Sequence, residues 1–331
     1  MVTIKDIAQQ AGVAKSTVSR YLNGGSVSKK TKAKLDQIVN ETGYAPNTFA
    51  QSLKAKKTNM IGTIIPRLDS FATNAILASI DEELRNRQYQ LIITNTNQNI
   101  AREVENIYTL AKQKVDGIIL LATVVTEAHR KAIAEVKIPV LLLGQSAEGL
   151  HTIVHQEYEA GFKMGSYATD LGHKQFLYFT VLKDDEAIGQ LRSKGVLDAL
   201  ENGSGTSVEV IETNFSFSKA YEKAMSVLAT TSATYILCAT DNIALAVMKA
   251  AHTLGLSIPN DFSLSGFGGY EVTSIVTPTI TTVKYPYKQL GSLSVTNLIE
   301  IIEGENAIRN LELPNVLVKR ESTIPYKKGA L

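Results

Sequence analysis

The chain has 331 residues, of which 44% are hydrophobic and 20% are charged, a balance typical of a globular protein with a large core. Its single cysteine, Cys238, excludes a disulfide framework and a thiolate metal cluster within one chain. The net charge of +2 is unevenly divided, because residues 1–60 carry ten Lys and Arg against three acidic residues and the remainder carries 24 against 29. A basic N-terminal segment on an acidic body indicates that this segment binds a polyanion.

The N-terminal sequence and the longest apolar runs argue against export and membrane insertion. The opening MVTIKDIAQQ lacks the uninterrupted apolar stretch of a secretory signal. The longest apolar runs, 118–122 and 140–143, have the length of strands and fall far short of a membrane span. We therefore expect a cytoplasmic protein with no membrane partner.

The first 45 residues have the pattern of three short helices. Apolar residues recur at helical spacing over 4–11, after a candidate N-cap at Thr3. A second helix is expected over 15–22, and a third begins after Ser28 and ends at Gly43. This arrangement predicts a helix-turn-helix domain over residues 1–46, in which the second helix enters the major groove of DNA.

Polar side chains of the expected second helix form the candidate DNA interface. Lys15, Ser16 and Arg20 can point into one groove, and Arg20 has the donor fork that suits guanine. The alternatives are a helical fragment with solvated lysines, or a phosphate-binding loop in AGVAKST, which lacks the glycine spacing and preceding strand of such a loop. The DNA-binding candidates are Thr3, Lys15, Ser16, Thr17, Ser19, Arg20, Asn23, Asn47, Ala50 and Leu53.

A polar linker over 47–58 leads to a body that begins at residue 59. Continuous apolar strands alternate with helices from residue 60 onward, which predicts a parallel sheet covered on both faces. The pattern restarts with a helix over 157–171, so we expect two doubly wound lobes and a ligand crevice at the carboxyl ends of their strands. The predicted first lobe comprises about 59–160 and 290–320, and the second about 161–289 and 321–331.

The string TIKDIA…AGVAKSTVSRYLN…VSKKT…GYAPNTFAQSLKAKKTNMIGTIIP resembles the signature of the lactose/galactose-repressor family, and shorter matches extend over nearly the whole chain. Ala14 stands where the family usually has Ser, so a helix cap or a phosphate contact would be lost. The resemblance implies a small all-α helix-turn-helix head and an α/β body like that of periplasmic sugar-binding proteins. It also implies a homodimer on a pseudo-palindromic operator. Paired hinge helices would insert Leu53 between base steps, with Ala50 permitting their close approach; the alternative for Leu53 is an ordinary packing contact.

The same resemblance implies effector contacts. Arg192 matches the family's sugar-binding arginine, Asp241 matches an acid of the family motif, and Phe215 falls where an aromatic ring often covers the apolar face of a sugar. Each residue also has a structural alternative, namely a surface ion pair for Arg192, a helix N-cap for Asp241 and a core ring for Phe215.

Two departures from the family pattern favour an anionic effector. Phe267-Gly268-Gly269-Tyr270 stands where most relatives have Tyr-Asp-Asp, which would leave backbone N–H groups in place of a carboxylate. Pro66-Arg67-Leu68-Asp69-Ser70 adds a positive charge, so Arg67 and Ser70 would hold a phosphoryl group; alternatively, Arg67 only pairs with a nearby acid. The two segments resemble sucrose-operon repressors of Gram-positive bacteria, which implies sucrose 6-phosphate as effector, ahead of sucrose, fructose or a trehalose phosphate. The effector candidates are Arg67, Asp69, Ser70, Gln145, Arg192, Phe215, Asp241, Gly268 and Tyr270.

No motif supports an enzyme, a metal site or a cofactor. The hydrolase, metalloprotease and dinucleotide signatures are absent, and the five histidines are scattered without ligand spacing. We interpret the chain as a repressor of a carbohydrate-utilisation operon, of the sucrose type, that a sugar or sugar phosphate releases from its operator. The alternatives are a global regulator of the same family that uses a phosphoprotein corepressor, and a two-lobed solute-binding protein.

Overall fold

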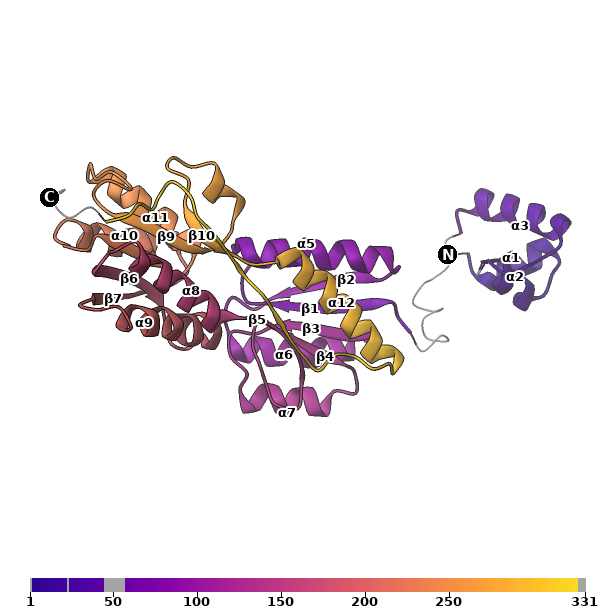
Figure 1. Cartoon of the computed structure of the whole chain (residues 1–331). Coiled ribbons are helices and arrows are strands. Elements are labelled where there is room, and N and C mark those ends of the chain that lie inside the picture. The colour runs from indigo at the N-terminus through magenta and orange to yellow at the C-terminus, as the bar shows by residue number, and fades with distance from the viewer. Residues whose placement is uncertain (1, 23, 45–56, 327–331) are drawn as a thin grey trace. The chain divides into compact units, whose positions relative to one another are not determined.

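The computed structural model describes residues 2–22, 24–44 and 57–326 and divides the chain into two units, 1–59 and 60–331 (Figure 1). The first unit contains the predicted head, and the second is the predicted body. Four DNA-binding candidates, Asn23, Asn47, Ala50 and Leu53, lie outside the described residues.

The head consists of the three predicted helices. They are α1 (Ile4–Ala11), α2 (Lys15–Leu22) and α3 (Lys29–Thr42). The Thr3 side chain caps α1 and forms a reciprocal capping box with Asp6, which satisfies two of the free N–H groups at the helix start. One fully buried residue from each helix, Ile7, Val18 and Leu35, forms the centre of the small core. The helical period of the sequence therefore defines the head correctly.

The first lobe of the body is a six-stranded parallel sheet in the order β11-β5-β4-β3-β1-β2. Successive residues of β3 face opposite sides: Ile119 packs against α5 and α12, and Ile118 packs against α6 and α7. Figure 1 shows α12 beside α5 over this sheet. The elements are β1 (Met60–Ile65), α5 (Phe71–Asn86), β2 (Gln90–Asn95), α6 (Ile100–Lys112), β3 (Gly117–Leu121), α7 (Glu127–Glu135), β4 (Val140–Leu143), β5 (His151–His155), α12 (Tyr287–Glu303) and β11 (Asn310–Leu313).

The second lobe repeats the architecture with the strand order β12-β10-β9-β8-β6-β7, in which only β12 runs antiparallel to its neighbour. Its sheet is covered by α8, α9, α10 and α11, whose buried faces share one core with the strands. The elements are α8 (Glu157–Asp170), β6 (Gln175–Val181), the π-helical segment η1 (Glu186–Arg192), α9 (Ser193–Glu201), β7 (Ser207–Thr213), α10 (Phe217–Leu228), β8 (Tyr235–Cys238), α11 (Asp241–Thr253), β9 (Ser263–Gly268), the 3₁₀ turn η2 (Glu271–Ser274), β10 (Thr281–Lys284) and β12 (Val316–Val318).

The chain crosses between the lobes three times, after β5, after β10 and between β11 and β12. The last crossing corrects the predicted lobe boundary near residue 320, because β12 already pairs with β10 in the second sheet. A three-residue strand carries too little periodicity to be recognised from sequence. Residues 186–201 form a π-helical turn that leads into α9. Within the described ranges, no helix has the length and apolar character that crossing a membrane requires.

Candidate functional site

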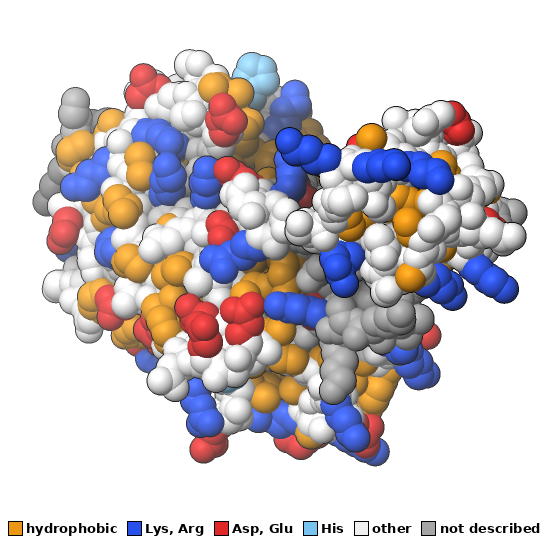
Figure 2. All heavy atoms as spheres, turned by 90° about the vertical axis from the view of Figure 1, so that its right-hand side faces the viewer, with side chains coloured by type: hydrophobic (Ala, Val, Ile, Leu, Met, Phe, Trp, Pro, Cys, Tyr) orange, Lys and Arg blue, Asp and Glu red, His pale blue; other side chains and the backbone are white. Residues whose placement is uncertain are grey.

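The candidate DNA-binding side chains of α2 lie on the side opposite the core of the head. Lys15, Ser16 and Arg20 are exposed, whereas Val18 between them is fully buried. Basic side chains, Lys and Arg together, also stand out from the head surface in Figure 2. The Tyr21 hydroxyl donates a hydrogen bond to the Asp36 carboxylate, which ties α2 to α3. The packing therefore presents the polar face of α2 to an external partner, as a recognition helix requires.

The remaining described DNA candidates are Thr3, Thr17 and Ser19. Thr17 and Ser19 are half-buried on α2. The Thr3 hydroxyl is engaged with the Asp6 carboxylate at 2.8 Å, so its first role is to cap α1.

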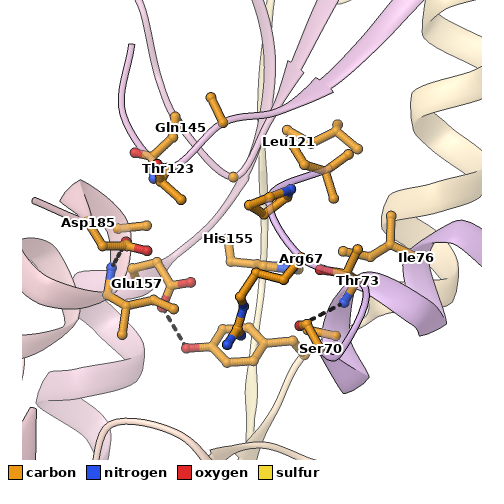
Figure 3. Close-up of a pocket in the computed structure, with 18 of the residues that line it drawn as sticks. Arg67, Ser70, Thr73, Ile76, Leu121, Thr123, Gln145, His155, Glu157 and Asp185 are labelled. Carbon is orange, nitrogen blue, oxygen red and sulfur yellow. Dashed lines mark hydrogen bonds between the residues drawn. The ribbon is translucent and has the colours of Figure 1, made fainter. Parts of the chain in front are cut away.

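A cavity lies between the two lobes of the body, at the carboxyl ends of the parallel strands, where the sequence predicted a ligand crevice. Arg67, Ser70 and Thr73 approach it from one side, and Glu157 and Asp185 approach it from the other (Figure 3). Five effector candidates line the cavity: Arg67, Ser70, Gln145, Arg192 and Phe215.

Arg192 forms a buried ion pair at the edge of η1. Its Nε and Nη2 lie 2.8 and 2.7 Å from Oε2 of Glu157, and its Nη1 donates to the Ala239 carbonyl at 2.6 Å. The guanidinium also makes cation–π contacts with the rings of Phe267 and Tyr285, at 5.0 and 5.1 Å from their centres. Burial alone lowers the pKa of Arg192, but the Glu157 carboxylate outweighs it and holds the pKa above its ordinary value. The pair is thus buried, unlike the surface ion pair considered from sequence, and its guanidinium still lines the cavity.

Arg67 has a different environment. Its guanidinium lies 4.4 Å from the centre of the Phe215 ring, a cation–π contact that joins the segment after β1 to the segment after β7. Its carboxylate neighbour, Asp69, is 3.9 Å away and 78% exposed, so solvent screens this pair strongly. Burial lowers the pKa of Arg67 from its ordinary value. Arg67 therefore presents a cation to the cavity without a close, buried carboxylate.

Asp241 does not line the cavity. Its carboxylate accepts hydrogen bonds from the Tyr270 N–H at 2.9 Å and from the Thr282 hydroxyl at 2.6 Å, and burial raises its pKa to about 6. The Gly269 N–H donates to the Thr282 hydroxyl. The prediction that this loop offers its N–H groups to a ligand is therefore corrected, because Asp241 and Thr282 already accept from them.

Three further effector candidates also lie outside the described cavity lining. Asp69 is exposed, and Gly268 ends β9. The Tyr270 ring packs against Phe71 at 5.1 Å. Their assignment to the effector remains a prediction without support from the cavity.

Sequence reasoning missed several lining residues because they come from separate elements. His155 ends β5, a strand that was not predicted, and both of its ring nitrogens are buried without a hydrogen-bond partner within the described ranges. Burial lowers the His155 pKa to about 4, which keeps the ring neutral. Tyr285 packs on it at 4.7 Å and donates from its hydroxyl to Glu157 at 2.6 Å. The sequence carried no signal that these residues meet. The other missed polar residues include Gln98, Thr123, Asp185 and Tyr287.

No cluster of three or more His, Cys, Asp or Glu side chains suited to a metal ion occurs in the described part of the chain. The one cysteine, Cys238, is fully buried in β8, and burial raises its thiol pKa. Its chemistry is therefore that of an inert core side chain.

The comparisons with known proteins cover both units. Residues 3–47 match the lacI family of bacterial regulatory proteins, and residues 166–323 match a periplasmic binding protein-like domain. The chain is 40% identical to a sucrose operon repressor of Staphylococcus xylosus over 306 residues, 92% of this chain and 95% of that protein. It is 28% identical to catabolite control protein A of Priestia megaterium, over 97% of this chain and 99% of that protein.

The structure resembles that of a Lac repressor dimer bound to operator and the anti-inducer ONPF. The TM-score is 0.89 at 27% sequence identity, and the likeness covers 98% of this chain and 99% of that one. These relatives are DNA-binding regulators and not enzymes. The exposed recognition helix, the interlobe cavity and the likeness over both units show that the chain belongs to the lacI family of bacterial regulatory proteins.

Proposed function

We propose that the chain represses a carbohydrate-utilisation operon, of the sucrose type, and binds a pseudo-palindromic operator as a homodimer. The observation that carries this proposal is the 40% identity to a sucrose operon repressor, which extends over head and body alike. A two-fold dimer presents two α2 helices, so its operator must carry two related half-sites. Operator binding also requires a cytoplasmic protein, as expected from the sequence.

The effector that we propose is sucrose 6-phosphate. Arg67 supports it, because this cation lines the cavity beside Ser70 and its ion pair is with the exposed Asp69, at 3.9 Å. Arg192, in contrast, is already neutralised by Glu157. Effector binding shifts the balance between two arrangements of the lobes, and the arrangement that the effector favours releases the operator.

A ligand titration of the Arg67→Ala variant tests the effector. We expect its affinity for sucrose 6-phosphate to fall by roughly 1.5–3 kcal/mol, the contribution of hydrogen bonds to a charged group, while its affinity for sucrose is nearly unchanged. Arg85→Ala is the matched control, because Arg85 lies on α5, is exposed and pairs with Asp81. Equal losses for both ligands, or no loss for either, would contradict a phosphoryl group at Arg67.

An operator-binding assay tests the head. Arg20→Ala should weaken specific binding by roughly 1–3 kcal/mol and relax the preference at one base position. Lys34→Ala, on the exposed face of α3, is the control. An equal loss on random DNA would instead make Arg20 a phosphate contact. The insertion of Leu53 between base steps stays part of this proposal and lies outside the described residues.

A regulator with a phosphoprotein corepressor is the second candidate, supported by the 28% identity to catabolite control protein A. A purified chain that leaves its operator on addition of sugar phosphate alone argues against it. The match of residues 3–47 to a DNA-binding family disfavours the solute-binding alternative.

A further inference from the structure

The carboxylate of Asp185 faces the interlobe cavity from the second lobe, across from Arg67 (Figure 3). Its Oδ1 accepts a hydrogen bond from the Ile188 N–H at 2.8 Å and so caps η1. The hydrogen bond from Ile188 goes to Oδ1, and no described residue forms a hydrogen bond with Oδ2 or an ion pair with this side chain. Burial raises the pKa of Asp185. One oxygen of this half-buried carboxylate is therefore left for a donor from outside the chain.

The other carboxylate that lines the cavity, that of Glu157, already has partners within the protein. Oε2 of Glu157 accepts from Arg192 and from the Tyr285 hydroxyl, so its charge is balanced within the protein. Asp185 has no such contact, although Arg67 and Arg192 lower its pKa from a distance. A half-buried carboxylate without a close cation favours a ligand that donates hydrogen bonds and disfavours a second negative charge.

We propose that Asp185 is a specificity-determining residue of the effector site, whose Oδ2 accepts hydrogen bonds from ligand hydroxyl groups while the phosphoryl group lies at the Arg67 end of the cavity. This proposal rests on the proposed sugar effector and adds the orientation of that effector in the cavity. The phosphoryl group lies at Arg67 and Ser70 on the first lobe, and a hydroxyl-bearing part of the ligand lies at Asp185 on the second. The recognised class is a polyhydroxylated compound with a single phosphoryl group at one end.

Capping of η1 alone does not explain the free oxygen. A cap needs one acceptor, and Asn supplies it as well as Asp does. The variant Asp185→Asn therefore keeps the cap and removes the charge together with one acceptor. Asp184→Asn is the matched control, because Asp184 is the exposed neighbour and does not line the cavity.

The experiment is isothermal titration of the full chain with sucrose and with sucrose 6-phosphate. We expect Asp185→Asn to weaken both ligands by roughly tenfold, since hydrogen bonds to a charged group are stronger than neutral ones. Asp184→Asn should leave both affinities within about twofold, as for a surface change remote from the ligand. Melting curves of the ligand-free variants check that the cap and the fold are kept. If the wild type binds only sucrose 6-phosphate, the affinities of the variants for that ligand alone test the proposal.

Unchanged affinities in Asp185→Asn would mean that the residue only caps η1, and the proposal would be wrong. Tighter binding of sucrose 6-phosphate would place Asp185 against the phosphoryl group, which also overturns it. In both cases Arg67→Ala still tests the proposed effector independently. A wild type that binds neither ligand overturns the proposed effector itself, and the assignment of Asp185 with it.

Discussion

Two buried charged groups of the second lobe and two polar groups of the first lobe differ in how their hydrogen bonds are satisfied. On the second lobe, Arg192 is bound by Glu157 and Asp241 is bound by the Tyr270 N–H and Thr282. On the first lobe, Arg67 rests on an aromatic ring, and both nitrogens of His155 lack partners within the described residues.

The difference separates the groups that build the site from those available to a ligand. A polar group with all of its hydrogen bonds satisfied inside the protein gains little from a ligand, whereas an unsatisfied one recovers the cost of its burial on binding. The second-lobe pairs are therefore expected to determine stability, and Arg67 and Asp185 are expected to determine selectivity. Four variants test this division, beginning with the largest expected effect.

The strongest test is Arg192→Met, which leaves Glu157 buried with the Tyr285 hydroxyl as its one side-chain partner among the described residues. We expect a loss of roughly 3–5 kcal/mol in the free energy of unfolding, as for other buried pairs with one partner removed. Urea denaturation of the full chain measures it. The double variant Arg192→Met/Glu157→Gln should recover much of the loss. A loss below about 1 kcal/mol would show that the pair contributes little.

His155 should make stability depend on pH. Its pKa is lowered by burial to about 4, so the unfolded chain binds the proton more tightly than the folded protein does. The stability contributed by the neutral ring is complete above the unfolded pKa of about 6.5 and is lost as the pH falls towards 4. Between pH 7 and pH 5 the wild type should lose about 2 kcal/mol that His155→Leu does not lose. His151→Gln, on the same strand, is the control, and equal slopes for wild type and His155→Leu would contradict the expectation.

Asp241 should make stability depend on pH in the opposite direction from His155. Its pKa is raised by burial to about 6, so the folded protein holds the proton more tightly than the unfolded chain, whose value is 3.8. The corresponding stability is complete below 3.8 and is lost as the pH rises through 6. From pH 5 to pH 7 the wild type should lose about 1 kcal/mol that Asp241→Asn retains, because an amide does not titrate. The same denaturation series measures both residues, and a variant with the wild-type slope would argue against a buried, protonatable Asp241.

The smallest expected effect on stability is that of Arg67→Ala in the absence of ligand. A partly exposed cation–π contact contributes roughly 0.5–1 kcal/mol, so the loss in unfolding free energy should stay within that range. A double-variant cycle with Phe215→Leu isolates the contact itself. A loss as large as that of Arg192→Met would place Arg67 among the groups that build the fold and remove the contrast between the two sides.

Much of the site was predictable where function depends on one local segment. The three head helices, the exposed positions of α2 and the cavity residues Arg67 and Ser70 all follow from motifs a few residues long. His155 and Tyr285 were not predictable, because they meet in space at the ends of β5 and β10, more than a hundred residues apart in the chain. Short strands such as β12 also escaped, because they carry too few residues for a period to show.

The sequence by itself determined the helix-turn-helix head, the two lobes of alternating strands and helices, and the carboxyl-end location of the cavity, because these depend on periodic burial along the chain. Only the tertiary structure decided which charges meet. Arg192 pairs with Glu157 across 35 positions, and Asp241 takes the Tyr270 N–H across 29. Desolvation and hydrogen-bond geometry depend on the packing of distant segments, so the charges left for a ligand become known only once the fold has assigned partners to the others.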